Sequence, residues 1–190
     1  MPDSPTYSDG DLLQLMQAGD EQAFTGLYGR HQSAVFRFAL QMSGSAEAAE
    51  EVTQEVFVVL MREAKQYDPN RGPLNAYLIG VARNLVLRWL NRERPYAAGD
   101  PEAERLESVA DAQDIFGDLK RNQTIEALRK AVLALPANYR EVVVLCDLQE
   151  MDYAEAASVL GCAVGTIKSR LHRARSLLLE KMRAADRCPA

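Results

Sequence analysis

The spacing of apolar residues predicts helices along nearly the whole chain. Between residues 20 and 42 an apolar side chain recurs every three or four positions, which is the period of an α-helix with one buried face. A shorter stripe precedes this segment and ends at Gly19, and the triplet SGS at 43–45 follows it. Because Asp and Ser accept hydrogen bonds from the free N–H groups of a first helical turn, we expect Asp20 and Ser45 to cap the second and third helices.

The rest of the chain repeats this pattern of helices and breaks. The loop sequence DPNRGP at 68–73 ends the third helix, and a fourth helix begins at Pro73 and ends before Pro95. Helical periodicity resumes near Leu119. The run VVVLC at 142–146 has strand propensity, but no second strand exists to pair with it, so we predict helix there as well. The predicted fold class is all-α.

The C-terminal end carries a helix-turn-helix pattern. Asp152 and Glu155 form a D-x-x-E capping signature that opens a short helix through Leu160. Gly161 suits the left-handed residue that ends a helix, and a second helix begins within about four residues, near Val164. Two helices joined by a tight glycine-bearing turn are typical of DNA-binding helix-turn-helix motifs.

A helical wheel of this last helix separates two faces. The apolar side chains that should pack on the preceding helix are Val164, Ile167, Leu171, Ala174 and Leu178. The opposite face carries Gly165, Ser169, His172 and Ser176, flanked by Lys168 and Arg173. Short side chains let a helix approach a major groove, and Lys and Arg reach phosphates or guanine edges. The alternative is a solvated cationic face on an ordinary bundle helix; together with the capped helix and the turn, the pattern favours DNA.

Charge is distributed unevenly, although the formal net charge of the whole chain is −5. Residues 71–96 hold five arginines and one acid, and residues 164–183 hold six basic residues and one acid. Between them, residues 97–118 hold seven acids, one base and only weak periodicity, which is typical of a linker.

The predicted organisation is therefore two small helical domains joined by an acidic linker. The segments are an N-terminal tail (1–7), a helical domain (8–96), the linker (97–118), a helix-turn-helix domain (119–183) and a C-terminal tail (184–190).

Two helices of the first domain suggest binding surfaces. Helix 73–94 interleaves arginines with Tyr77 and Trp89, which suits single-stranded DNA because cations follow the backbone and rings stack on bases. The alternative is that both rings belong to the core. Helix 46–66 is apolar on two faces with an acidic and amide rim, which is typical either of a central bundle helix or of one that docks a partner.

Several function classes are excluded or disfavoured. The longest apolar run, Val56–Met61, is far too short to span a membrane, and the acidic N-terminus is unlike a signal peptide, so we expect a cytoplasmic protein without membrane insertion. The three cysteines and two histidines lack metal-ligand spacing, so neither a metal nor a cofactor is predicted. Without a phosphate-binding glycine loop or a nucleophile–base pair, an enzyme is not expected.

Three segments resemble the σ factors of bacterial RNA polymerase, and the chain length is similar to that of the extracytoplasmic-function (ECF) group. They are AEEVTQEVFVVLMREAKQYDP, GPLNAYLIGVARNLVLRWLNRER and LPANYREVVVLCDLQEMDYAEAASVLGCAVGTIKSRLHRARSLL, and their order and spacing make the resemblance highly specific. The resemblance implies a σ2 domain that melts the −10 element and a σ4 domain that reads the −35 duplex. It implies core RNA polymerase (β′ clamp helices and β flap), promoter DNA and an anti-σ protein as partners.

The resemblance also implies roles for individual residues. Those matching the −35 recognition helix are Thr166, Lys168, Ser169, Arg170, His172 and Arg173. Those matching the −10 single-strand surface are Arg83, Asn84, Arg88, Trp89 and Arg92. Those matching the polymerase-docking surface are Glu50, Gln54, Glu55, Phe57 and Met61. The chain departs from the family pattern at Leu74, Tyr77, Arg88 and Ala163.

Two other functions are consistent with parts of the sequence. A free-standing helix-turn-helix regulator accounts for the C-terminal domain but leaves the arginine- and aromatic-rich helix without a role. An adaptor that uses its helices only for protein contacts accounts for helix 46–66 but leaves the basic face without a role.

Overall fold

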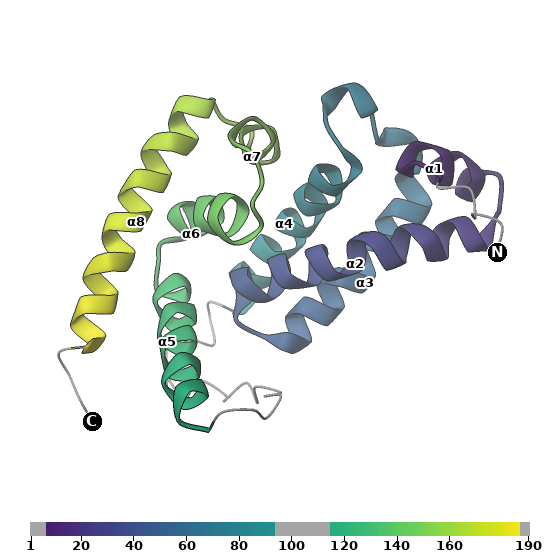
Figure 1. Ribbon diagram of the computed structural model, residues 1–190. Helices are drawn as coiled ribbons and strands as arrows, with labels where there is room; N and C mark the ends of the chain where they lie inside the picture. Colours follow the sequence, from purple (N-terminus) through teal and green to yellow (C-terminus); the bar gives the residue numbers. More distant parts are fainter. Residues whose placement is uncertain (1–6, 94–114, 187–190) are drawn as a thin grey trace.

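The computed structural model describes residues 7–93 and 115–186, with side chains from 7–92 and 124–183. All regular structure in these residues is helical, which confirms the predicted all-α fold class. Figure 1 shows two groups of helices, α1 to α4 in one and α5 to α8 in the other. We refer to them as the N-terminal half (7–93) and the C-terminal half (115–186).

The N-terminal half is a bundle in which α2, α3 and α4 pack on one another and α1 lies along α2. Its elements are α1 (Asp9–Gln17), α2 (Glu21–Ser43), α3 (Ala46–Glu63), the 3₁₀ turns η1 (Ala64–Gln66) and η2 (Pro69–Arg71), and α4 (Leu74–Glu93). Its core consists of apolar side chains at helical spacing, among them Leu27, Phe38, Leu60 and Ile79, none of which is exposed.

The predicted caps set the bounds of these helices. Asp20 Oδ1 accepts the N–H of Gln22 at 2.8 Å, and Ser45 Oγ accepts the N–H of Ala48 at 3.2 Å. Between α2 and α3, Gly44 has a φ of 76°, a left-handed conformation that glycine adopts without steric cost. The predicted caps at Asp20 and Ser45 and the predicted break at 43–45 are confirmed.

The C-terminal half contains the predicted helix-turn-helix. Its elements are α5 (Ile115–Leu133), α6 (Ala137–Val143), the π-helix η3 (Val144–Leu148), α7 (Tyr153–Leu160) and α8 (Val164–Asp186). The start of α5 lies four residues inside the segment predicted as linker. The run 142–146 is helical, as predicted, but it widens into a π turn, in which the N–H of Gln149 donates to the carbonyl of Val144 at 2.9 Å.

The two halves are in contact. α7 lies beside α4, and both α5 and η3 lie against α2. At the turn after α2, a Cβ on Gly44 would stand only 2.9 Å from Cδ1 of Leu133, so the backbone of the N-terminal half approaches α5 closely. This contact places the turn after α2 beside α5, although the two segments are far apart in the sequence (Figure 1).

Within the described ranges, no helix combines the length and apolar character that crossing a membrane requires.

Candidate nucleic-acid interface

The helix-turn-helix forms where the sequence predicts it. Asp152 Oδ1 accepts the N–H groups of Ala154 and Glu155, each at 2.8 Å, so α7 begins with both donors satisfied. α7 ends at Gly161, whose φ is 62°, and α8 begins three residues later at Val164. The cap and the turn together set where α7 begins and ends.

Replacing Asp152 by alanine is expected to lower the free energy of unfolding by about 1 kcal/mol, because the first turn of α7 loses its acceptor. Thermal denaturation followed by circular dichroism measures this loss. Asp152→Asn is the matched control, since asparagine caps helices as well as aspartate. An equal loss in both variants would contradict a capping role.

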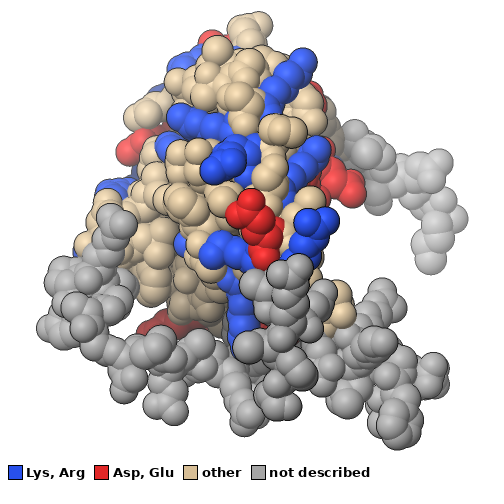
Figure 2. Space-filling model, turned by 90° about the vertical axis from the view of Figure 1, so that its left-hand side faces the viewer, with Lys and Arg blue, Asp and Glu red and all other residues tan. Residues whose placement is uncertain are grey.

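α8 separates its two faces as the helical wheel predicts. Ile167, Leu171 and Ala174 are at most 2% exposed, whereas Val164, at the first position of the helix, is 38% exposed. The residues exposed on the opposite side are Gly165, Lys168, Ser169, His172 and Arg173, and Ser176 on the same side is half-buried. Viewed from the side of α8, Figure 2 shows Lys and Arg side chains gathered down this face of the molecule.

Two basic residues of α8 have partners within the C-terminal half. Arg175 donates from Nε and Nη2 to the carboxylate of Asp147, at 3.0 and 2.5 Å, and these hydrogen bonds raise the pKa of Arg175. Arg175 therefore ties α8 to η3. Lys168 Nζ lies 6.0 Å from the ring centroid of Tyr153, the first residue of α7. Of the predicted −35 residues, Thr166 and Arg170 are only half-exposed and lie at the edge of the face.

Asn84 lies at a pocket between the two halves. This pocket has a volume of about 280 Å³ and is lined by η2, α4 and α7; we call it the Asn84 pocket. Tyr67 and Tyr77 form an aromatic pair in its wall, with ring centroids 5.6 Å apart, and Tyr67 Oη donates to the carbonyl of Gly72 at 3.1 Å. The exposed guanidinium of Arg71 lies at the same pocket.

Three other predicted −10 residues lie at a different place. Arg88, Trp89 and Arg92 line a pocket of about 450 Å³ between α3 and α4, together with Glu51 and Glu55. Arg92 Nη2 stands 3.8 Å from a carboxylate oxygen of Glu51. The predicted −10 set is thus split between two pockets, and its second part shares a pocket with Glu55 of the predicted docking set.

Arg83 is held by an ion pair, although its side chain remains 24% exposed. Its Nε donates to Glu141 Oε1 at 2.7 Å and its Nη2 to Oε2 at 3.3 Å, so the pair is bidentate. Glu141 belongs to α6 and is 4% exposed.

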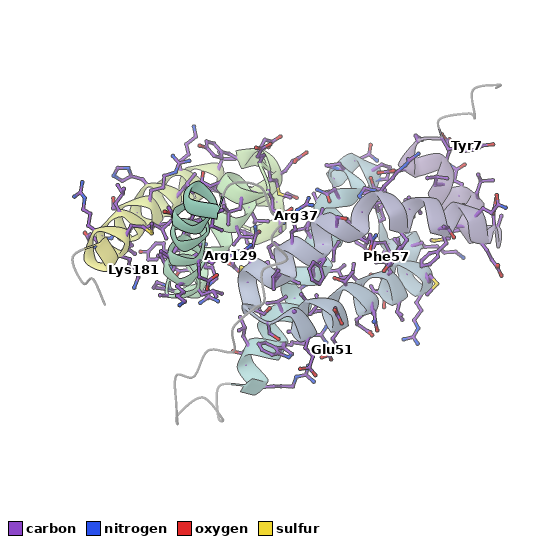
Figure 3. The ribbon with its side chains drawn as sticks, turned by 60° about the horizontal axis from the view of Figure 1, so that its bottom comes forward. Tyr7, Arg37, Glu51, Phe57, Arg129 and Lys181 are labelled. Atoms are coloured by element: carbon purple, nitrogen blue, oxygen red, sulfur yellow. The ribbon has the colours of Figure 1, made fainter. Side chains whose placement is uncertain are left out.

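The predicted docking face on α3 needs one correction. Glu50, Gln54, Glu55 and Met61 are exposed, but Phe57 is only 2% exposed. The Phe57 ring packs against the rings of Phe24 and Tyr28 on α2, at centroid distances of 6.3 and 4.7 Å. Figure 3 shows it inside the N-terminal half, whereas Glu51 points outward. The expectation that Phe57 lies on an exposed face is wrong.

Sequence reasoning missed several residues at these sites. Tyr67 and Arg71 line the Asn84 pocket, but the loop pattern at 68–73 gave no sign of a pocket wall. Ser158 and Val159 of α7 complete that wall from a segment about 75 positions away. Glu141 carries no local signal, since its partner Arg83 lies 58 positions earlier in the sequence.

Comparisons with known proteins agree with this architecture. Two family models match, Sigma-70 region 2 over residues 27–96 and Sigma-70, region 4 over residues 125–178. The chain is 28% identical to the ECF RNA polymerase sigma factor SigW of Bacillus subtilis, over 90% of this chain and 95% of SigW. It is 30% identical to the ECF RNA polymerase sigma factor SigM of Mycobacterium tuberculosis, over 90% of this chain and 83% of SigM.

A solved structure is similar as well. The sigma factor RpoE in complex with the anti-sigma factor NepR, from Bartonella quintana, matches with a TM-score of 0.63 and 29% identity. The match covers 84% of this chain and 96% of RpoE.

Proposed function

The chain belongs to the ECF group of RNA polymerase σ factors, and from this premise we propose which of its surfaces recognise a promoter. The outer face of α8 reads the −35 duplex, and α4 with the Asn84 pocket holds the melted −10 strand. The observation that carries this assignment is the first half of α8, where Ile167, Leu171 and Ala174 are buried and the opposite side presents small, polar and basic side chains from Gly165 to Arg173.

The −35 contact follows from the geometry of α8. Gly165 and Ser169 leave room for the helix to enter a major groove, and Lys168 and Arg173 stand beside them to reach phosphates or guanine edges. His172 and Ser169 can form hydrogen bonds with base edges. Thr166 and Arg170, at the edge of the face, contact the DNA backbone. Arg175 is excluded because Asp147 binds it.

The −10 contact has two parts. Asn84 can form hydrogen bonds with the edge of a flipped base, and the rings of Tyr67 and Tyr77 supply flat apolar walls for it. Arg88, Trp89 and Arg92 form a second surface one to two helical turns farther along α4, where cations follow the strand and the indole stacks.

Core polymerase supplies the affinity for DNA that the free chain lacks. An acidic chain of net charge −5 binds DNA weakly by itself, since phosphate binding grows with the number of cations. The chain docks on the β′ clamp helices through Glu50, Gln54, Glu55 and Met61, and on the β flap through the C-terminal half. Once it is docked, each of its contacts with DNA is made within one complex and is effectively intramolecular. Nucleotide chemistry then belongs to the polymerase, and we assign no catalytic step to this chain.

The similarity to RpoE, solved with the anti-sigma factor NepR, supports an anti-σ protein as a further partner of this chain. Because the chain binds RNA polymerase, we place it in the cytoplasm.

Asn84→Ala is expected to reduce open-complex formation about 5- to 150-fold, which corresponds to the 1–3 kcal/mol of one base contact. Permanganate reactivity of unpaired thymines measures the effect in the reconstituted holoenzyme. Binding to core polymerase should be unchanged. Asn138→Ala, exposed on α6, is the matched control, and equal melting by Asn84→Ala and Asn138→Ala would contradict the proposed role of Asn84.

Duplex binding with and without polymerase tests the proposed function. Start sites selected by the reconstituted holoenzyme define a promoter, and gel shifts then compare the free chain with the holoenzyme at physiological salt. We expect sequence-specific binding by the holoenzyme alone. Nanomolar binding by the free chain, or no initiation by the holoenzyme, would instead indicate a free-standing regulator or an adaptor.

A further inference from the structure

The side chain of Tyr153 joins the two helices of the helix-turn-helix. Tyr153 is the first residue of α7 and is 38% exposed, so water reaches part of its ring. Lys168 Nζ of α8 stands over this ring at 6.0 Å from its centroid, within the range of a cation–π interaction. The face of an aromatic ring carries partial negative charge and therefore attracts the ammonium group. The ring thus gives Lys168 a preferred position that α8 alone does not provide.

The other end of the Tyr153 side chain is held as well. Hydrogen bonds from Arg175 to Asp147 raise the pKa of Arg175, and the Tyr153 hydroxyl adds to this rise by interacting with the same guanidinium. Arg175 lies seven positions beyond Lys168, which is about two helical turns along the same side of α8. The Tyr153 side chain therefore spans two cations of α8, with its hydroxyl at Arg175 and its ring at Lys168.

Lys168 differs in this respect from Arg173 on the same face. Within the part of the chain whose side chains are described, no carboxylate pairs with Lys168, and neither a carboxylate nor an aromatic ring holds Arg173. A long side chain that is free in solution loses rotamer freedom when it binds, whereas one that is already held loses less. Lys168 is thus positioned before DNA binds, and Arg173 is a cation of the same face without such a support.

We propose that Tyr153 is a positioning residue for −35 recognition, which holds Lys168 beside the outer face of α8 in the orientation that contacts DNA. The inference rests on the proposed function of α8 and goes beyond it, because Tyr153 belongs to α7 and acts through Lys168 instead of through a promoter contact of its own. Since the ring is exposed, its replacement leaves the apolar core intact, and the effect can be measured in a folded protein.

A double-mutant cycle in the reconstituted holoenzyme tests the proposal. Fluorescence anisotropy measures the affinity of the holoenzyme for promoter DNA with Tyr153→Leu, with Lys168→Ala and with both changes together. Tyr153→Phe, which keeps the ring and removes the hydroxyl, is the conservative control. In a second, matched cycle Arg173→Ala takes the place of Lys168→Ala. Circular dichroism of each free variant checks that it is folded.

We expect Tyr153→Leu to weaken promoter binding about two- to fivefold, which corresponds to the 0.5–1 kcal/mol of an exposed cation–π contact. Tyr153→Phe should keep most of the wild-type affinity. In a chain that already carries Lys168→Ala, Tyr153→Leu should cause no further loss, because the ring then has no cation to hold. In a chain that carries Arg173→Ala, Tyr153→Leu should cause its full loss, since the effects of residues that do not interact are additive.

Three results would overturn the proposal. The first is an undiminished loss from Tyr153→Leu in the Lys168→Ala chain, which would mean that Tyr153 acts independently of Lys168. The second is an equal loss in Tyr153→Phe and Tyr153→Leu, and the third is wild-type affinity in Tyr153→Leu while Lys168→Ala binds weakly. All three leave the proposed function of α8 intact. Wild-type affinity in both Lys168→Ala and Arg173→Ala would instead refute that function, so the two failures are distinguishable.

Discussion

Replacing Phe57 by alanine is expected to lower the free energy of unfolding of the N-terminal half by about 3–5 kcal/mol. The ring is 2% exposed and fills the space between α2 and α3, where it contacts Phe24 and Tyr28. Alanine leaves a cavity and removes both aromatic contacts, and a close-packed bundle collapses only partly into such a space. Loss of polymerase binding in this variant is then a consequence of unfolding and not of a lost docking contact.

Urea denaturation monitored by the fluorescence of Trp89, the single tryptophan of the chain, measures this effect within the affected half. Met61→Ala is the matched control on the same helix, since Met61 is 52% exposed and its truncation should change stability by about 0.5 kcal/mol or less. A Phe57→Ala protein as stable as Met61→Ala would contradict the burial of this ring.

Arg173→Ala is expected to weaken binding of the holoenzyme to the −35 element about 5- to 150-fold, with binding to core polymerase unchanged. Arg173 is exposed on the outer face of α8, and one good bidentate contact with a guanine is worth about 1–3 kcal/mol of discrimination. The loss of affinity should depend on the DNA sequence at −35, because a contact with a base edge distinguishes one sequence from another and a contact with a phosphate does not.

Fluorescence anisotropy with promoters that differ only at −35 measures this discrimination, and a pull-down measures polymerase binding. Arg129→Ala is the matched control, since it removes one exposed positive charge from α5 in the same half. Equal loss of −35 affinity in Arg173→Ala and Arg129→Ala would indicate a general effect of charge. If Arg173→Ala lost polymerase binding as much as −35 binding, the result would indicate damage to the fold.

Local chemistry explains why the helix bounds could be predicted from the sequence. Asp20, Ser45 and Asp152 cap helices, and Gly161 ends one, because each of these choices depends only on neighbouring backbone groups. The two faces of α8 were also predictable, since a regular helix turns by a fixed angle per residue. The start of α5 could not be predicted because the segment 97–118 has the acidic composition of a linker, and that composition is the same whether or not a helix begins there.

Long-range packing explains what could not be predicted. A helical wheel shows that α3 is apolar on two sides, but only the fold shows that Phe24 and Tyr28 cover Phe57 while Met61 stays exposed. The partner of Arg83 lies 58 positions away, so neither its pairing nor the interface between the halves has a local signal. The sequence resemblance places the −10 residues on one surface, whereas Asn84 and Trp89 line different pockets.

The central claim is that α8 and the Asn84 pocket contact separate promoter elements within one open complex. Photo-cross-linking tests it most directly, with benzoyl-phenylalanine introduced at Ser176, on the outer face of α8, or at Arg71, at the Asn84 pocket. We predict that position 176 cross-links to duplex DNA at the −35 element and position 71 to the unpaired strand at the −10 element. Cross-links from both positions to the same element, or none to DNA from position 176, would contradict the account.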